Sequence, residues 1–362
     1  MSKSKIINNC QSAFFKWTVM KTNMKSIYKN NSIRIFSVGL VLAVMVALGG
    51  MMQSCSSEDD VFADDFISLT KEEKDLVSQF DIVGIIHNEV MDQVYEKLLE
   101  SLENTNISSN EILAMTLNNT RVATHLSIAS TNKFFPKLKN GSSNIDETHI
   151  DSFVNMGFKL VVNTKAIKLK NLSNVPITPD ETIRDILSNK SQNLNTYLKT
   201  LLIITEKNNS IEQYNKEINS LIVNAFKNLG REEMEIFLCA SSTAKHSFEY
   251  WYTYLHDWEN MLLKRNSNNI VRLKNNNSES PYNDPRFIQM RNDIIKWDIG
   301  GALGGMVAGS ITGPGILLCG IAGSAGSSTT AAIVDAFDFY GVDLWEGFKN
   351  EMQQLWNNIF NW

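Results

Sequence analysis

A glycine repeat near residue 300 constrains the fold of this chain more than any other feature of the sequence. Glycine recurs there with a strict spacing of four residues, at Gly301, Gly305, Gly309 and Gly313. Small residues recur in the same way over 315–334, with Gly320 and Gly323 among them. Two helices that each carry a stripe of small side chains can approach each other backbone to backbone. Pro314 and Gly315 suit the turn between them, so we expect a closely packed helical hairpin.

The N-terminal region has the pattern of a secretory signal. An uncharged apolar run over 35–52 follows basic residues that include Lys29 and Arg34, and this order of charge and apolarity is typical of a signal peptide. Ser54 and Cys55 come directly after the run. An uncleaved transmembrane anchor is the alternative, although the run is near the lower length limit for crossing a bilayer.

Residues 52–55, Met-Gln-Ser-Cys, resemble the lipobox of bacterial lipoproteins, although Gln53 is larger and more polar than the residue usual there. The resemblance implies cleavage before Cys55 and attachment of diacylglycerol to its sulfur. Acyl chains such as palmitate contribute about 0.8 kcal/mol per buried methylene, so several chains would form a stable anchor in membrane lipid. The serine and acidic cluster over 56–60 resembles a Gram-negative signal for export to the outer membrane and the cell surface; a solvated acidic linker is the plainer interpretation.

These features predict three parts along the chain. Residues 1–54 are the signal peptide, with translation expected to begin at Met24, because the preceding leader is unusually long. Residues 55–66 are an acidic tether, and residues 67–362 are one helical domain. The polar stretch over 265–286 contains two prolines and is a loop that could mark a boundary within that domain.

The charge and cysteine content exclude several classes of function. Removal of residues 1–54 takes away seven basic and no acidic residues, which leaves 27 basic and 39 acidic residues, a net charge of −12. Such an acidic chain is not expected to bind nucleic acid. Cys239 and Cys319 are the two cysteines beyond Cys55. Both lie in apolar helical contexts, so we expect buried thiols, with a disulfide as the alternative.

The remaining pattern predicts an all-α, multi-helix bundle that buries the glycine-rich hairpin near the C-terminus. Apolar residues recur at spacings of three and four, and capping signals start several segments, such as Thr70 with Glu73 and Thr178 with Glu181. Helices are expected over 70–102, 108–119, 120–137, 146–162, 178–206, 210–229, 231–262, 284–313, 315–334 and 343–360.

The segment 231–262 is the most aromatic part of the chain. Its helical stripe includes Phe237, Trp251, Tyr254 and Trp258. Large rings commonly fill space opposite small residues. We therefore expect this helix to dock against the glycine hairpin.

Histidine residues provide the candidate polar site. His87 and Asn88 follow Gly84 in a helix, and this Gly-x-x-His-Asn feature resembles one found in uncharacterised helical lipoproteins. Those proteins resemble this chain again in a Ser-x-x-Tyr-Trp segment and a late glycine-rich stretch, here Ser247, Tyr250 and Trp251 and then residues 300–326. The resemblance implies no activity. The pair could bind a metal or polar ligand, but we favour a hydrogen-bonded pair that fixes helix register against the hairpin.

His246 and Glu249 form a second candidate, because they lie three residues apart on one helix. Two Glu-x-x-His helices can build a di-metal site. Here the order is reversed and no matching second motif is present, so we expect no metal and no cofactor. The chain also contains no Gly-x-Ser-x-Gly motif, no His-Glu-x-x-His motif and no phosphate-binding loop.

The sequence therefore favours a non-enzymatic, lipid-anchored envelope protein that binds an unknown protein or small molecule. One alternative is a membrane-active, bacteriocin-like protein that inserts residues 299–334. A second alternative is a metal-dependent enzyme that uses His87 or His246. Burial of the hairpin is favoured over insertion, because its side chains are mostly small and Ser and Thr are frequent in it.

Overall fold

The computed structural model describes residues 66–104, 109–134, 147–169, 178–208, 210–263, 284–309 and 315–339. The chain divides into two units, residues 1–64 and 65–362, and every described residue belongs to the second. Within the described ranges all regular structure is α-helical, and no strand occurs there. This confirms the predicted fold class. The apolar run over 35–52, Cys55, the tether up to residue 65 and the expected helix over 343–360 lie outside the described residues.

The helix α4 (Lys71–Asn104) begins with the predicted capping box. The Thr70 backbone N–H donates to Glu73 Oε2 (2.7 Å), and the Glu73 N–H donates to Thr70 Oγ1 (3.3 Å). These bonds satisfy two of the donors that a helix N-terminus leaves free. The apolar face is buried along its length, at Val83, Ile86, Val90, Val94 and Leu98.

Next, α5 (Ser109–Phe134) is one helix where two were expected, over 108–119 and 120–137. Neither proline nor glycine interrupts the stretch around residue 119, where the first of the two was expected to end. The Thr120 hydroxyl donates to the Thr116 carbonyl (2.7 Å), and its oxygen lies 3.0 Å from the Thr329 hydroxyl on a distant helix. Tertiary packing therefore outweighs the modest helix propensity of Asn118 and Asn119. The helix α7 (Glu147–Leu169) follows.

The expected long helix over 178–206 is in fact two helices, α8 (Pro179–Ile186) and α9 (Gln192–Lys207). The predicted capping box of Thr178 and Glu181 starts α8. A turn over 187–190 ends it, and the Ser191 hydroxyl caps α9 by accepting from the Leu194 N–H (3.2 Å). Serine at the N-cap stabilises a new helix start, which explains the break. Ser210 caps α10 (Ile211–Ala225) in the same way.

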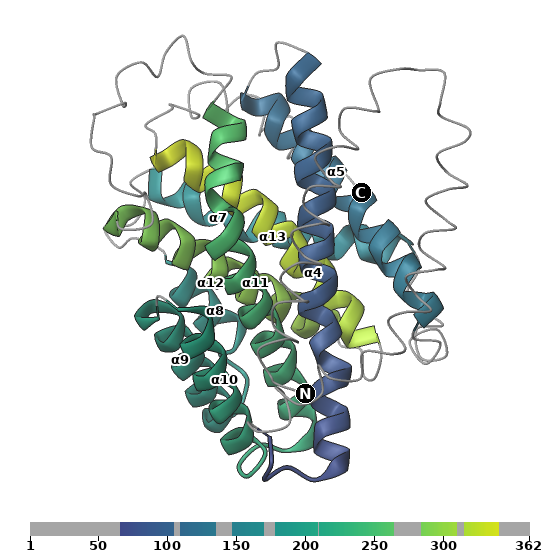
Figure 1. The fold of residues 1–362 in the computed structure, drawn as a ribbon, viewed down its shortest axis with the longest axis vertical. Helices are drawn as coiled ribbons and strands as arrows, with labels where there is room; N and C mark the ends of the chain where they lie inside the picture. Colours follow the sequence, from purple (N-terminus) through teal and green to yellow (C-terminus); the bar gives the residue numbers. More distant parts are fainter. Residues whose placement is uncertain are drawn as a thin grey trace, which may run out of the picture. The chain divides into compact units, whose positions relative to one another are not determined.

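The aromatic helix α11 (Arg231–Leu263) packs against α4 and against α12 (Pro285–Gly309). The predicted hairpin consists of α12 and α13 (Gly315–Phe339), which pack extensively against each other. The helix α13 also contacts α7, α4, α5 and α11 (Figure 1). Residues Gly315–Ala336 are long and apolar enough to cross a membrane, yet all of them lie inside the protein.

Glycine allows the hairpin backbones to touch. A Cβ on Gly301 would overlap the Gly323 carbonyl oxygen, and a Cβ on Gly305 would overlap that of Cys319. Gly320 faces α11, where a Cβ would lie 2.6 Å from Cys239 Sγ. Two other glycines were predicted to pack in the hairpin. Gly309 is the last residue of α12, and its contacts are not among those described; Gly313 lies outside the described residues.

Both remaining cysteines are free, buried thiols, as the sequence predicted. Burial raises the pKa of the Cys239 thiol far above its usual range and that of the Cys319 thiol to about 12. Because the thiolate is the reactive form, these two side chains are packing groups. The aromatic helix α11 contacts both helices of the hairpin, as predicted, and its side chains Phe237, Trp251 and Trp258 are buried.

Candidate functional site

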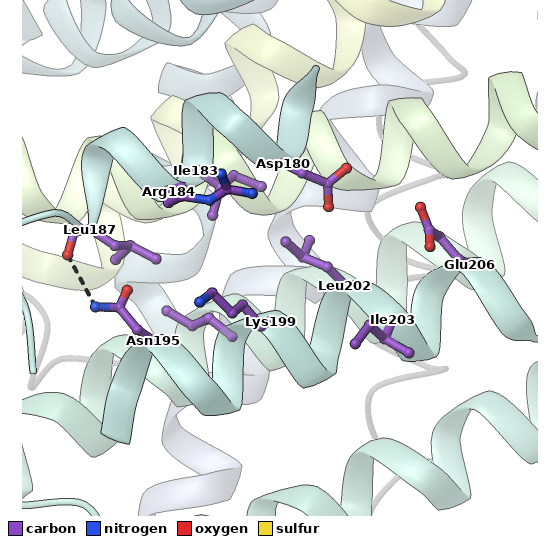
Figure 2. Close-up of a pocket in the computed structure, with 10 residues that line it drawn as sticks. Asp180, Ile183, Arg184, Leu187, Asn195, Lys199, Leu202, Ile203 and Glu206 are labelled. Carbon is purple, nitrogen blue, oxygen red and sulfur yellow. Dashed lines mark hydrogen bonds between the residues drawn. The ribbon is translucent and has the colours of Figure 1, made fainter. Parts of the chain in front are cut away.

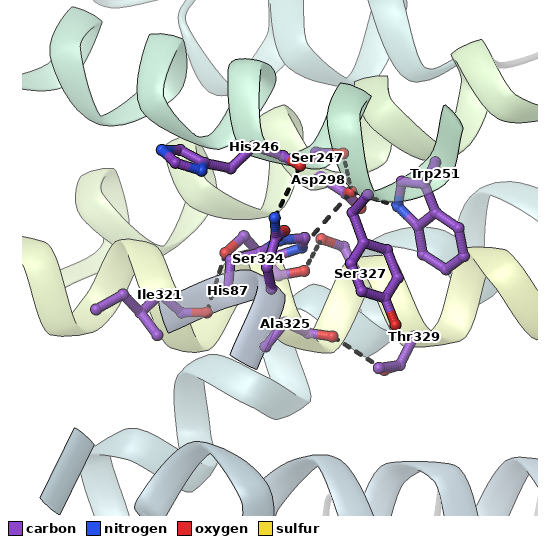
Figure 3. Close-up of polar contacts among 12 residues, drawn as sticks. His87, His246, Ser247, Trp251, Asp298, Ile321, Ser324, Ala325, Ser327 and Thr329 are labelled. Atoms are coloured by element: carbon purple, nitrogen blue, oxygen red, sulfur yellow. Dashed lines mark hydrogen bonds and ion pairs between the residues drawn. The ribbon is translucent and has the colours of Figure 1, made fainter. Parts of the chain in front are cut away.

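A buried polar cluster forms where three helices meet (Figure 3). It consists of His87 and Asn88 from α4, Ser247 and Trp251 from α11, and Asp298 from α12. Four of these residues belong to the short motifs singled out in the sequence. Asp298, directly before the glycine-rich stretch, belongs to none of those motifs, yet residues of both other helices contact it.

Asn88 joins α4 to α11. Its Oδ1 accepts a hydrogen bond from His87 Nδ1 (3.0 Å), and its Nδ2 donates to the backbone carbonyl of His246 (3.0 Å). Gly84, one turn earlier, brings the helices close enough for this. A Cβ there would lie 2.6 Å from the Ser242 carbonyl oxygen, and the Gly84 N–H donates to Ser242 Oγ (3.0 Å). The spacing Gly-x-x-His-Asn therefore sets how α4 docks.

Asp298 receives two hydrogen bonds from α11. Ser247 Oγ donates to its Oδ2 (2.5 Å), and Trp251 Nε1 donates to the same oxygen (3.0 Å). Burial raises the pKa of the Asp298 carboxyl to about 8, even though the hydrogen bonds from Ser247 and Trp251 act to lower it. The carboxyl therefore holds a proton in neutral solution.

His87 is its partner across the helix contact. The Nδ1 proton points at Asn88, so Nε2 is the unprotonated nitrogen, and it lies 3.6 Å from Asp298 Oδ2. Burial lowers the pKa of the His87 imidazole to about 4. Imidazole and carboxyl are therefore both uncharged at neutral pH, which reduces the cost of enclosing two ionisable groups. Each side chain is 0% exposed, so solvent does not reach either, and the pair acts as a contact between helices.

His246 and Glu249 do not join this cluster. His246 Nε2 pairs with Asp81 Oδ1 (3.0 Å) near the surface. Burial alone would raise the pKa of Asp81, but the hydrogen bond and attraction from His246 lower it. Glu249 is exposed on α11. Within the described helices, no three His, Cys, Asp or Glu side chains lie close enough together to hold a metal ion.

A second site, absent from the sequence prediction, is a half-open groove of about 180 Å³ between α8 and α9 (Figure 2). Both helices pack on α12, and the groove opens between them. Its walls are mainly apolar, with Ile183 from α8, Leu187 from the turn after it, and Leu198, Leu202 and Ile203 from α9. Treating 178–206 as a single helix hid this site, although the polar run Ser188 to Ser191 and its capping serine were a signal for the break.

Charged groups are unevenly distributed along the groove, as Figure 2 shows. At one end Lys296 Nζ binds Asp180 Oδ2 (2.8 Å) and Glu206 Oε1 (2.5 Å). Burial alone would lower the pKa of the Lys296 ammonium, but the hydrogen bonds and charges of these two carboxylates raise it overall. Arg184 and Lys199 line the middle, and neither has an ion pair within the described part of the chain.

The groove can therefore bind an anionic group beside apolar surface, whereas the His87–Asp298 cluster is enclosed. Comparisons with protein-family models, curated proteins and solved structures give no match to this chain.

Proposed function

We propose that this chain is a non-enzymatic envelope protein, anchored to the outer membrane by lipid on Cys55, that binds a ligand in the α8–α9 groove. The observation that carries the binding proposal is the groove itself: apolar walls and two unpaired cations in reach of solvent. Ligand sites combine such apolar lining with a few convergent polar groups. The enclosed His87–Asp298 cluster offers nothing comparable, because no ligand can reach it without opening the bundle.

A blocked groove tests the binding proposal. Ile203 lines the groove and Ile85 lies on α4, and the two are similarly exposed, at 46% and 47%. Ligand-observed NMR with the full chain in lipid nanodiscs would screen small anionic, cationic and neutral organic molecules. Binding is expected to survive Ile85→Trp and to disappear in Ile203→Trp. A panel without any binder, or equal loss in both variants, would remove the groove from the proposal.

The lipid anchor needs a separate test, because it depends on the lipobox-like residues before Cys55. Cells fed an alkyne-bearing palmitate analogue should label the protein, and the label should appear in the outer-membrane fraction. Cys55→Ser should abolish labelling and release the chain from the membrane. A Cys55→Ser variant that stays in the membrane, together with an original chain that takes up no label, would instead favour the uncleaved anchor over 35–52.

The second candidate function is insertion of the hairpin into a membrane. It is favoured by one observation, the apolar stretch Gly315–Ala336. Its 22 residues would span about 33 Å as a helix, enough for a bilayer core of about 30 Å. Insertion would first have to separate the glycine contacts and the polar cluster. The full chain should therefore leave dye-loaded vesicles of neutral and of anionic lipid intact; leakage would favour this candidate instead.

The metal-enzyme alternative receives no support from the residues around His87 or His246. His87 contacts an amide and a protonated carboxyl, and His246 contacts one carboxylate. Elemental analysis of the purified protein tests this alternative directly, since a bound metal at one equivalent would revive it.

A further inference from the structure

We infer that the α8–α9 groove is selective for a small organic monocarboxylate with a short apolar chain, an inference that rests on the binding function proposed above. The groove juxtaposes the unpaired cations Arg184 and Lys199 with the apolar side chains of Ile183, Leu198 and Leu202. A ligand that satisfies both features has one anionic head and an apolar tail.

The two cations define the head group. Arg184 on α8 and Lys199 on α9 line facing walls, as Figure 2 shows, and both are exposed. A guanidinium offers a planar fork that matches a carboxylate, and an ammonium adds a second charge. This pair is locally positive in a chain whose overall balance is acidic. Charge complementarity of this kind favours an anion over a cation or a neutral molecule.

The acidic end of the groove limits the ligand to one negative charge. Asp180 and Glu206 share the single ammonium of Lys296, so this end retains an excess negative charge. Their side chains are 35% and 52% exposed, so they face whatever enters. A second carboxylate at the far end of a ligand would meet like charge there, which is unfavourable. A dicarboxylate of the same length should therefore bind more weakly.

The volume of the groove limits the size of the ligand's apolar tail. The groove has a volume of about 180 Å³, below the range of about 300–1,000 Å³ typical of sites for larger organic ligands. At the other end, Asn195 Nδ2 donates to the Leu187 carbonyl across the gap (3.4 Å). A small ligand with a chain of about six carbons is therefore a suitable probe for a groove of this size.

Hexanoate is the probe that tests this inference. Its comparison molecules are adipate (a dicarboxylate of equal length), hexylammonium and 1-hexanol. Titrations monitored by ligand-observed NMR would use the full chain in lipid nanodiscs, with empty nanodiscs subtracted. Hexanoate is expected to bind at least tenfold more tightly than each of the other three.

The variant Arg184→Gln/Lys199→Gln removes the two cations without removing the apolar walls. It should weaken hexanoate binding at least tenfold and leave 1-hexanol binding unchanged. The matched control is Lys207→Gln/Lys216→Gln, which removes two exposed lysines outside the groove lining and should bind hexanoate like the original chain. Circular dichroism and thermal melting would establish that both double variants fold.

The outcomes separate this inference from the binding function. If 1-hexanol or adipate binds as tightly as hexanoate, and Ile203→Trp abolishes that binding, the groove is a ligand site but the monocarboxylate inference is wrong. Equal hexanoate binding by both double variants would overturn it in the same way. If none of the four molecules binds, the inference fails, and the broader panel decides whether the binding function fails with it.

Discussion

Gly301 on α12 and Gly323 on α13 meet backbone to backbone, each at the position where the other would carry a Cβ. The carbonyl oxygen of either residue occupies that space. A third helix joins them, since a Cβ on Gly157 of α7 would also overlap the Gly323 carbonyl. Three helices therefore share one point at which no side chain fits. Because packed backbones cannot yield as a flexible side chain does, this contact fixes the spacing of the hairpin.

Gly323→Ala should destabilise the protein by about 3 kcal/mol, since overpacking here must separate two helices. The matched control is Gly304→Ala on α12, where a Cβ would meet the flexible end of Met156 at 3.4 Å. That change should be neutral or stabilise by up to about 1 kcal/mol, because alanine favours helix over glycine. Chemical denaturation measures both. Equal stability losses for the two variants would show that the contact is looser than described.

The same comparison shows what the sequence could predict of the hairpin. A four-residue glycine spacing has a direct physical consequence, so close packing followed from it. The spacing did not predict which glycines form the contact, because Gly301 and Gly304 look alike in sequence and differ only in what faces them. Gly157 carries no repeat signal at all, although it joins the same contact.

The aromatic stripe on α11 separates into buried and exposed members. Trp251 is fully enclosed and binds Asp298, whereas Tyr254 is 43% exposed. Trp251→Ala should cost about 3–5 kcal/mol of stability, because it leaves a large cavity and removes one of the two hydrogen bonds that the buried Asp298 carboxyl accepts from α11. Tyr254→Ala should cost less than about 1 kcal/mol. Thermal melting compares the two, and an unchanged melting temperature for Trp251→Ala would rule out docking of α11 on the hairpin.

The polar sites were less predictable than the packing. Gly84, His87 and Asn88 form a short motif in the sequence, and their contacts explain it. Gly84 binds Ser242, Asn88 binds the His246 carbonyl, and His87 lies against Asp298. The groove was missed for a different reason. Serine and asparagine can end a helix or continue one, and the correct choice at 188–191 depends on how α8 and α9 pack on α12, which the local sequence does not contain.

Lys296 ties α12 to both walls of the groove. Lys296→Met should lower stability by about 1–2 kcal/mol, a modest value because its partners Asp180 and Glu206 are partly exposed and screened. Since the folded pKa of Lys296 is raised, this stabilisation is present below pH 10.5 and lost as the pH rises through the folded value. Lys199→Met, at an exposed lysine without an ion pair, should change stability by less than about 0.5 kcal/mol. Urea denaturation at neutral and alkaline pH distinguishes them, and a Lys296→Met loss that persists unchanged at alkaline pH would argue against the ion pairs.

Asp298 should make stability fall as the pH rises from about 4 to about 8. Its pKa is about 8 in the folded chain against 3.8 for a free carboxyl, so the folded state holds the proton more tightly and loses this advantage between about pH 4 and pH 8. His87 acts in the opposite sense, but only between its folded pKa of about 4 and 6.5. From pH 6.5 to 8 only Asp298 of this pair changes the free energy of unfolding. At about 1.4 kcal/mol per pH unit, the loss of stability over this range is roughly 2 kcal/mol.

Asp298→Asn isolates that contribution, because an amide resembles the protonated carboxyl and its oxygen can still accept from Ser247 and Trp251. At pH 6.5 the variant should match the original chain within about 1 kcal/mol, and its stability should decline less between pH 6.5 and 8. Asp151→Asn is the control, since Asp151 pairs with His125 at the surface and should leave the decline intact. Urea denaturation at several pH values supplies the comparison. If Asp298→Asn declined as steeply as the original chain, the carboxyl would be ionised in the folded protein at neutral pH.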